Sequence, residues 1–340
     1  MTELSSAEVH AVSQTVEREL KWAEKNIHGQ TTPKAVLLAG QPGAGKTVLS
    51  SLMIPSLNND AVLVNGDDYR RYHPEYRALY EKYGSDAVAM TSPFSNKVTE
   101  TLIERFSDLH YNMVIEGTGR TVEVPKRTAE LLTAKGYSVE MAVIAARPIL
   151  SLISTVQRFY QMNARGTIPR ATAVEAHDNV VSSLPGNLDT LCALPTISRI
   201  TIWTRDAELK YDSRASASLP SASLKSVWME KWSSSEIAET KELIDGLRSL
   251  EEKIGLGQGH IIDEIQKRFR QEISDIREQA RYYTDENAQV SISNVQVDVQ
   301  VNAPVVTDNV SVAPLDEDNT PVSAKNAPVN RDNTPVTTPV

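Results

Sequence analysis

The sequence contains a single cysteine, Cys192, among its 340 residues, so no disulfide can form within the chain. Its neighbours Leu191, Ala193 and Leu194 are apolar, a setting typical of a small buried hydrophobe rather than of a reactive thiol. Because stable disulfides are rare in the cytoplasm, a chain without them fits that reducing compartment.

Long hydrophobic runs are also missing. No stretch approaches the ~20 apolar residues that a membrane-spanning helix needs. Residues 1–21 lack the charged start and the apolar run of a signal peptide. We therefore expect a cytoplasmic protein with no membrane partner.

Positive charge is scarce. Lys and Arg number 35 against 44 Asp and Glu, which gives a formal net charge of −9. Surfaces that bind nucleic acids or membranes usually need a basic field, so we expect neither kind of partner. A local basic pocket for phosphate groups is still compatible with this balance.

Apolar residues make up 40% of the chain, less than in a typical globular domain, which indicates that part of the chain does not pack. The C-terminal segment 285–340 has this character. It contains no aromatic residue and repeats the sequence DNTPV at 318–322 and 332–336. Such a segment cannot bury enough apolar surface to offset its ordering entropy, so we predict a low-complexity, disordered tail.

Short apolar runs alternate with helical patterns in the first part of the chain. The runs predict strands at about 35–39, 61–64, 112–115, 138–144 and 200–203. Strands that alternate with helices imply right-handed crossovers and a mostly parallel sheet with helices on both faces, which is an α/β fold. Ligands of such sheets bind beyond the carboxyl ends of the strands.

Helical periodicity is clearest in three places of this part. They are residues 95–109, the run after Pro125, and residues 149–162. Further along, residues 236–247 and 261–282 are amphipathic and separated by a break at 255–257. This second part reads as a helical hairpin docked on the main domain, or alternatively as a partner-binding helix.

These patterns divide the chain into three regions. We predict an α/β domain at 1–221, a helical extension at 222–284 and the tail at 285–340. The boundaries follow the changes in composition and periodicity along the chain.

The strongest motif follows the first expected strand and precedes a helical run, the context in which G-x-x-x-x-G-K-[ST] is specific. Its residues are Gly40, Gln41, Pro42, Gly43, Ala44, Gly45, Lys46 and Thr47. The glycines let backbone N–H groups turn towards anionic oxygens, and the following helix adds its positive end. Lys46 suits the β and γ phosphates of ATP, and the Thr47 hydroxyl suits Mg²⁺. The motif therefore predicts a P-loop that binds ATP and Mg²⁺.

Nucleotide binding does not define the reaction, which depends on residues at the other strand ends. Asp67 and Asp68 follow the second strand, and Glu116 ends the third. A carboxylate there can bind Mg²⁺ through water or accept the proton of an acceptor hydroxyl. Alternatively, Asp67 or Asp68 only caps the next helix. The guanine signature of GTPases and the Asp-Glu strand end of motor ATPases are absent, so the P-loop kinase fold is favoured.

Four arginines follow the fourth strand: Arg147, Arg158, Arg165 and Arg170. P-loop kinases often close an arginine-bearing lid on the transferring phosphate, because the planar guanidinium bonds two oxygens at once and stays protonated. We expect at least two of the four to be functional. His177 could be a catalytic base, but we favour a helix histidine paired with a local carboxylate.

Five segments taken together resemble the zeta toxin family. They are AVLLAGQPGAGKT, NGDDYRRYHPEY, TSPFSNKVTETLIERFSDLHYNMVIEGTGRTVEVP, QRFY and PRATAVEAHDNVV. The resemblance covers about residues 33–212, in order, and is far more specific than the P-loop alone. Zeta toxins are bacterial kinases that transfer the γ-phosphate of ATP to the 3′-hydroxyl of the N-acetylglucosamine unit of UDP-N-acetylglucosamine. Their product blocks peptidoglycan synthesis, and a small helical antitoxin protein inhibits them at the ATP site.

The resemblance implies the same substrate and partner here, and it implies roles for the residues at matching positions. Lys46 and Thr47 match the phosphate and Mg²⁺ ligands, and Asp67 matches the general base. Arg158 and Arg170 match the two lid arginines. The substrate-pocket positions correspond to Glu100, Glu116, Thr118, Arg120 and Thr128.

The chain departs from the family pattern in three respects. Asn65 stands where the family usually has a carboxylate, which bears on Mg²⁺ and on the orientation of Asp67. The loop between Arg158 and Arg170 looks one residue shorter than usual, and the tail has no counterpart. Two other functions stay open: a P-loop kinase of another small-molecule hydroxyl, and an ATP-gated regulatory protein that acts through residues 222–340.

Overall fold

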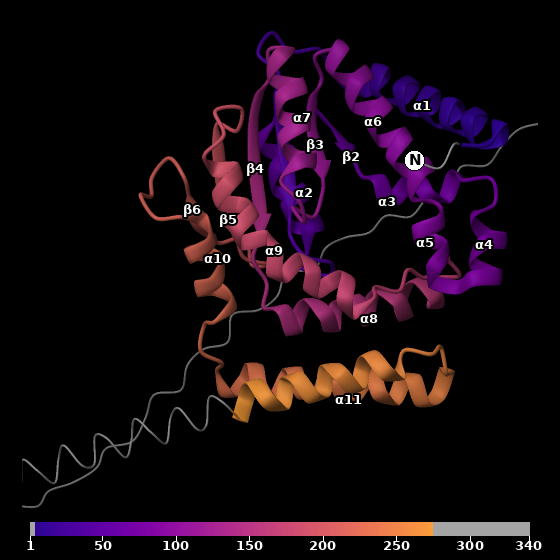
Figure 1. Cartoon of the computed structure of the whole chain (residues 1–340), viewed down its shortest axis with the longest axis vertical. Helices are drawn as coiled ribbons and strands as arrows, with labels where there is room; N and C mark the ends of the chain where they lie inside the picture. The colour runs from indigo at the N-terminus through magenta and orange to yellow at the C-terminus, as the bar shows by residue number, and fades with distance from the viewer. Residues whose placement is uncertain (1–3, 275–340) are drawn as a thin grey trace, which may run out of the picture. The chain divides into compact units, whose positions relative to one another are not determined.

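Six strands form one sheet in the order β2-β3-β1-β4-β5-β6 (Figure 1). The computed structural model describes residues 4–274. The strands are β1 (Lys34–Ala39), β2 (Ala61–Val64), β3 (Asn112–Glu116), β4 (Ser138–Ile144), β5 (Arg199–Trp203) and β6 (Leu209–Asp212). β1 to β5 pair in parallel, and β6 runs antiparallel to β5. All five predicted strands are present, and β6 is an addition that the apolar pattern did not predict.

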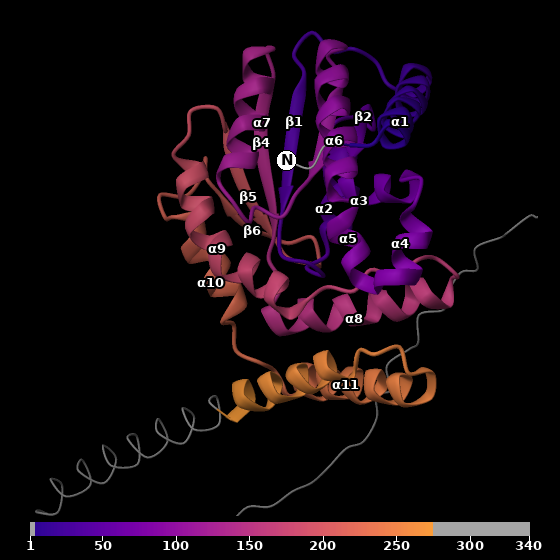
Figure 2. The same ribbon diagram turned by 45° about the vertical axis from the view of Figure 1, so that its right-hand side comes forward.

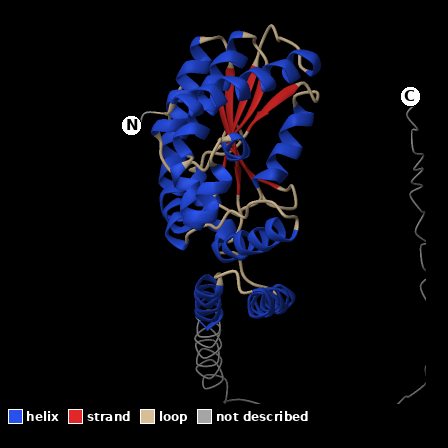
Figure 3. Cartoon of the chain, turned by 90° about the vertical axis from the view of Figure 1, so that its right-hand side faces the viewer, coloured by secondary structure: helices blue, strands red, loops and turns tan. Residues whose placement is uncertain are grey.

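Helices lie on both faces of this sheet (Figure 3). They are α1 (Ser6–Asn26), α2 (Lys46–Ser56), α3 (Gly66–Tyr69), α4 (Tyr76–Tyr83), α5 (Ala87–Met90), α6 (Ser92–Asp108), α7 (Glu123–Ala134), α8 (Pro148–Ala164), α9 (Val174–Cys192), α10 (Pro220–Trp228) and α11 (Ser234–Ile254). The three helices predicted in the first part of the chain correspond to α6, α7 and α8. The α/β fold with a mostly parallel, doubly covered sheet is therefore confirmed.

The central strand β1 shows why the sequence folds in this way. Its apolar residues are buried on both faces, as expected for a strand in the middle of a parallel sheet. Because side chains alternate along a strand, Leu37 packs into one hydrophobic cluster with α1, α6, α7 and α9, whereas Leu38 packs into another with α2. Cys192 is half-buried at the edge of the first cluster.

A helical hairpin follows the sheet region. Its first helix, α11, begins at a capping box in which Ser233 and Glu236 each satisfy the other's backbone N–H. It ends at Gly255, whose φ of 65° is the left-handed conformation that favours glycine. The chain is helical again over residues 259–274. The predicted break between the two helices is confirmed, and predicted helical residues after 274 lie outside the described part.

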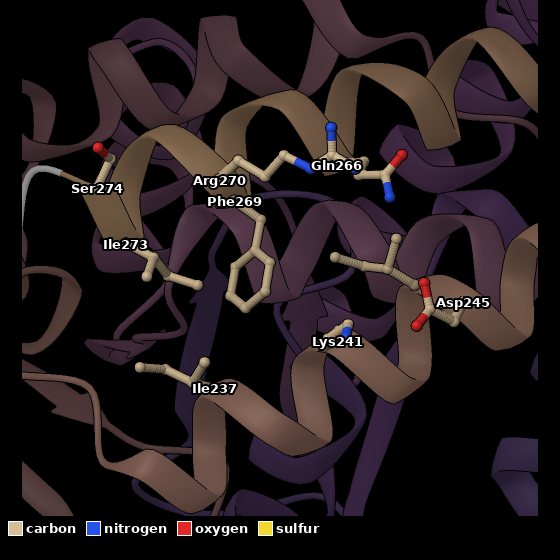
Figure 4. A pocket seen from close by; sticks show the side chains of 9 residues that line it. Ile237, Lys241, Asp245, Gln266, Phe269, Arg270, Ile273 and Ser274 are labelled. Carbon is tan, nitrogen blue, oxygen red and sulfur yellow. The ribbon is translucent and has the colours of Figure 1, made fainter.

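The hairpin packs against α8, which runs between it and the sheet (Figures 1 and 2). A third hydrophobic cluster joins them, with Leu152 and Val156 of α8 against Ile244 of α11 and Ile265 of the second helix. The two hairpin helices leave a cavity of about 320 Å³ between them (Figure 4). Its lining comes entirely from the hairpin: Ile237, Lys241, Ile244, Asp245, Gln266, Phe269, Arg270, Ile273 and Ser274.

Contacts group all the described residues, 4–274, in one compact unit. The boundary between an α/β domain at 1–221 and an extension at 222–284 stays a prediction, and the tail at 285–340 lies outside the described residues. Within the part of the chain that the structure describes, no helix is long and apolar enough to cross a membrane.

Candidate active site

The phosphate loop, residues 40–47, connects the end of β1 to the start of α2. Gly43 and Gly45 have φ of 76° and 105°, a backbone conformation that side chains rarely adopt. A Cβ atom on Gly43 would lie 2.0 Å from the carbonyl oxygen of Ser151 in α8. The loop therefore needs glycine both for its turn and for its close contact with α8.

Lys46 is the first residue of α2, and its Nζ donates a hydrogen bond to the carbonyl oxygen of Gly40 at 3.1 Å. Burial lowers the pKa of Lys46, and the positive charge of Arg158 lowers it further, against the opposing effect of the Glu116 carboxylate. Among residues 4–274, the carbonyl of Gly40 is the one hydrogen-bond partner of this ammonium group. It is thus poorly compensated and suited to an arriving anion.

Asp67 lies in α3, at the carboxyl end of β2. The helix cap comes from Asn65, whose Oδ1 accepts from the backbone N–H of Asp67 at 3.1 Å. Asn65 Nδ2 also donates to Asp68 Oδ2 at 3.1 Å. A carboxylate in place of Asn65 could not donate this bond and would repel Asp68 instead. The unusual asparagine therefore orders both aspartates.

Two guanidinium groups contact the Asp67 carboxylate. Arg70 Nε donates to Oδ1 at 3.2 Å, and Arg170 Nη1 lies 3.5 Å from Oδ2. Burial alone would raise the pKa of Asp67, but the charges of Arg170 and Arg70 outweigh it and hold the pKa below its ordinary value. The side chain remains half-exposed, so the carboxylate is ionised and accessible.

Arg158 adds its positive charge to that of Arg170 near this carboxylate, and it also lowers the pKa of Asp67. The Nε atom of each is buried and has no hydrogen-bond partner in the described part of the chain. Burial lowers the pKa of Arg158, and the neighbouring charge of Arg170 adds to this effect. Together with Lys46, they form a cluster of incompletely satisfied cations, the arrangement expected where a polyanion binds.

A cavity of about 610 Å³ opens beside Asp67 and Arg170. Its lining comes from the segment after β2, from the end of α8 and from the connection between α8 and α9: Asp67, Asp68, Arg71, His73, Pro74, Tyr76, Arg77, Met162, Gly166, Thr167, Ile168 and Arg170. The cavity combines an ionised carboxylate with three arginines. It can accept a ligand that carries both hydroxyl groups and negative charge.

The five residues expected in a substrate pocket lie elsewhere than this cavity lining. Glu116 ends β3, and Thr118 and Arg120 follow it, with the Arg120 N–H donating to Thr118 Oγ1 at 3.3 Å. Glu100 in α6 accepts from Arg127 Nη2 at 2.9 Å, and Arg127 precedes Thr128 in α7. Glu116, Thr118 and Arg120 thus lie at the end of β3 and on the loop that follows it, and Glu100 lies beside the helix that carries Thr128.

Glu116 lies in this region with a carboxylate that accepts from Ser50 Oγ at 3.4 Å. Burial raises the pKa of Glu116, and the charges of Asp68 and Asp67 oppose the lowering effect of Lys46. Folding therefore favours the protonated form. The stability that depends on this group is fully present below the ordinary pKa of 4.5 and is lost as pH rises through the raised value.

Glu116→Gln should consequently stabilise the protein at neutral pH, because glutamine resembles the protonated carboxyl without its charge. We expect the gain in unfolding free energy over wild type to be small near pH 4 and to grow as pH rises above it. Urea unfolding at a series of pH values measures this. Glu130→Gln, which removes an exposed carboxylate 3.9 Å from Lys126 Nζ, is the control and should show no such trend. A constant difference across pH would contradict the prediction.

Sequence patterns missed two arginines of the site. Arg205 follows the carboxyl end of β5 and donates from Nε to the carbonyl of Ala44 at 3.0 Å and from Nη2 to that of Gly43 at 2.6 Å. Arg70 is held by Asp67 and by the carbonyl of Val88. Arg205 could have been found from the rule that ligands bind beyond the carboxyl ends of strands. Arg70 could have been found from its position three residues after Asp67, a spacing at which side chains on a helix meet.

A bound metal would have few protein ligands here. Among the described residues there is no group of three or more His, Cys, Asp or Glu side chains placed to hold a metal ion. Mg²⁺ in phosphate sites keeps several waters and needs only one or two protein oxygens. Thr47, exposed at the second position of α2, fits such a role.

Comparison with known proteins gives a consistent result. The model of the protein family named Zeta toxin matches residues 18–216. The chain is 39% identical over 222 residues to Toxin PezT of Streptococcus pneumoniae, covering 64% of this chain and 87% of that protein. It is 40% identical over 216 residues to Toxin zeta of Streptococcus pyogenes, covering 63% of this chain and 75% of that protein.

A solved structure from the PezAT chromosomal toxin–antitoxin system of Streptococcus pneumoniae is also similar. It aligns with a TM-score of 0.64 at 32% identity, over 73% of this chain and 98% of that chain. A parallel sheet, a phosphate loop and a cation cluster beside a strand-end carboxylate together define a P-loop, kinase-like protein. Within that class, the chain belongs to the zeta toxin family.

Proposed function

We propose that this protein transfers the γ-phosphate of ATP to the 3′-hydroxyl of the N-acetylglucosamine unit of UDP-N-acetylglucosamine. The observation that carries the proposal is the clustering of Lys46, Arg158 and Arg170, all partly buried and incompletely hydrogen-bonded, near the ionised carboxylate of Asp67. A triphosphate satisfies those donors, and a hydroxyl fits the carboxylate. The zeta toxin names of its relatives favour this substrate over other hydroxyl compounds.

The residues of the site have different roles in the phosphate transfer. Asp67 orients the acceptor hydroxyl and takes its proton as the new O–P bond forms and the bond from the γ-phosphorus to the bridging oxygen breaks. Arg158 and Arg170 stabilise the charge on the transferring group, and ADP leaves with the bridging oxygen. Mg²⁺, which Thr47 would help to hold, neutralises phosphate charge when bound.

The cavity beside Asp67 supports a charged acceptor. Arg71 and Arg77 line it together with Arg170, so a substrate with a diphosphate would find cations on more than one side. An uncharged sugar or nucleoside would bring no anion to these guanidinium groups. This favours a nucleotide sugar over the alternative of another small-molecule hydroxyl.

The proposal includes a biological role as a toxin that blocks peptidoglycan synthesis and is inhibited by an antitoxin protein. Its support is the family and the PezAT system, whose name describes a toxin together with an antitoxin. Copurification with the product of an adjacent gene would test the partner directly.

The reaction is tested by incubating the full chain with ATP, Mg²⁺ and UDP-N-acetylglucosamine and analysing the products by mass spectrometry. We expect the UDP-sugar to gain the mass of one phosphate, and Lys46→Ala to produce no gain. Other hydroxyl acceptors, such as nucleosides and aminoglycosides, serve as competing substrates. No gain on the UDP-sugar, with ATP still bound, would reject this acceptor.

A further inference from the structure

A continuous line of polar contacts runs from the phosphate loop to the helical hairpin. Gln41 Nε2 donates to Ser151 Oγ at 3.2 Å, and Ser151 Oγ lies 2.7 Å from His177 Nε2. His177 Nδ1 lies 3.0 Å from Asp178 Oδ1. The Asp178 carboxylate then accepts two hydrogen bonds, at 2.9 and 2.8 Å, from the Arg268 guanidinium of residues 259–274.

The chemistry of these groups sets the direction of the bonds. An ionised Asp178 can only accept, so His177 carries its hydrogen on Nδ1. Burial lowers the pKa of His177, and the neutral ring therefore presents an unprotonated Nε2. That nitrogen accepts the hydrogen of Ser151, which otherwise has the carbonyl of Pro148 as its acceptor at 2.8 Å. Through His177, Asp178 thus determines the direction in which the Ser151 hydroxyl donates its hydrogen. Gln41 contacts that hydroxyl.

The middle of this line lies directly under the phosphate loop. The backbone of Ser151 is in contact with Gly43, and Gln41 also donates to the carbonyl of Ala146 at 2.7 Å. Arg158 follows Ser151 by seven residues, and at 3.6 residues per turn both lie on one face of α8. The position of α8 consequently affects the phosphate loop and Arg158 together.

We propose that Arg268 is a positioning residue that holds the phosphate loop in its anion-binding conformation through Asp178, His177 and Ser151. Arg268 is part of the helical extension, far along the chain from the loop that it supports. Without it, the Asp178 side chain, which is 39% exposed, is free to rotate into water. His177 then loses the partner that fixes its protonated nitrogen, and Ser151 is free to turn to Pro148.

The experiment compares Arg268→Gln with a matched control in the same hairpin. Arg248 also makes two side-chain bonds, to Asp263 at 2.7 Å and to Gln266 at 2.8 Å, but these stay within the hairpin. Arg268 likewise has a bond within the hairpin, from Nε to Glu264 Oε1 at 2.8 Å. Arg248→Gln therefore reproduces the loss of charge and of bonding within the hairpin without affecting the line to the loop. Arg268→Lys keeps the charge but not the two-pronged geometry, so it should show an intermediate effect.

Two readouts are measured on the full-length chain. Hydrogen exchange of the amides of residues 40–47 should be faster in Arg268→Gln and unchanged in Arg248→Gln. The dissociation constant for ATP–Mg²⁺ should rise by about 3- to 30-fold in Arg268→Gln, the range typical of residues that act through a coupling network. The KM for the acceptor substrate should stay near its wild-type value.

A double-mutant cycle distinguishes the proposed coupling from a general destabilisation of the fold. Ser151→Ala breaks the line next to the loop without touching the hairpin, so adding Arg268→Gln to it should produce little further exchange in residues 40–47. Additive effects, or equal effects of Arg248→Gln and Arg268→Gln, would overturn the proposal. The ATP measurement rests on the proposed function, whereas hydrogen exchange does not. If wild type binds no ATP but the exchange pattern holds, the proposed function fails and this inference stands.

Discussion

Asp67→Asn should lower the turnover number by ~10²–10⁴-fold, the usual loss when a catalytic base is removed. Asparagine keeps the shape of the side chain but cannot take the proton of the acceptor hydroxyl. The dissociation constant for ATP should change little, because Lys46 and the phosphate loop remain. Steady-state kinetics of phosphate transfer, with calorimetric titration of ATP, measures both quantities.

Asp68→Asn is the matched control for this substitution. It removes a neighbouring carboxylate whose contact is with Asn65, and it should retain most of the wild-type turnover. If the two variants lose activity equally, the effect comes from charge near α3 and not from a base at Asp67. If Asp67→Asn keeps near-wild-type turnover, another group accepts the proton.

Asp67→Asn should also change the free energy of unfolding, and the lowered pKa of Asp67 gives the direction of that change. A depressed pKa means that folding favours the ionised carboxylate, here because Arg170 and Arg70 contact it. Its contribution is present above the ordinary value of 3.8 and is lost as pH falls through the lowered value. The base is therefore also a counter-charge for the arginines around it.

The sheet and its ligand-binding edge were predictable because each depends on short stretches of sequence. An apolar run such as residues 35–39 predicts a buried strand by itself, and the phosphate loop is recognisable from eight consecutive residues. β6 was not predictable in this way, since two of its four residues are exposed and only Tyr211 is buried. Its place is decided by pairing with β5, which is a tertiary contact.

Within the site, the limit of sequence reasoning lies at contacts between distant residues. Gln41 occupies a variable position of the phosphate-loop motif, and nothing local indicates that it bonds to α8. His177 was predicted to pair with a nearby carboxylate, as it does with Asp178, but its second bond to Ser151 spans 26 positions. The 90 positions between Asp178 and Arg268 place that contact beyond any pattern of periodicity or spacing.

Arg158→Met should raise the thermal midpoint of unfolding while it removes most of the transfer activity. Burial and the nearby charge of Arg170 lower the pKa of Arg158, so the folded state disfavours its charged form. Since arginine stays protonated, this cost is present at every working pH, and an apolar side chain of similar length removes it. The loss of the arginine's charge on the transferring phosphate should lower turnover by about 10³-fold or more.

Arg165→Met is the control, because Arg165 is exposed at the end of α8 and its replacement should alter neither quantity. Calorimetric unfolding and phosphate-transfer kinetics, measured on both variants, distinguish a structural role of Arg158 from a role in the reaction. If it were a structural residue, Arg158→Met would lower the midpoint along with the activity. A raised midpoint with lost activity means that the folded protein keeps a destabilising charge in place for its reaction, as expected where cations are held ready for a phosphate that is not yet bound.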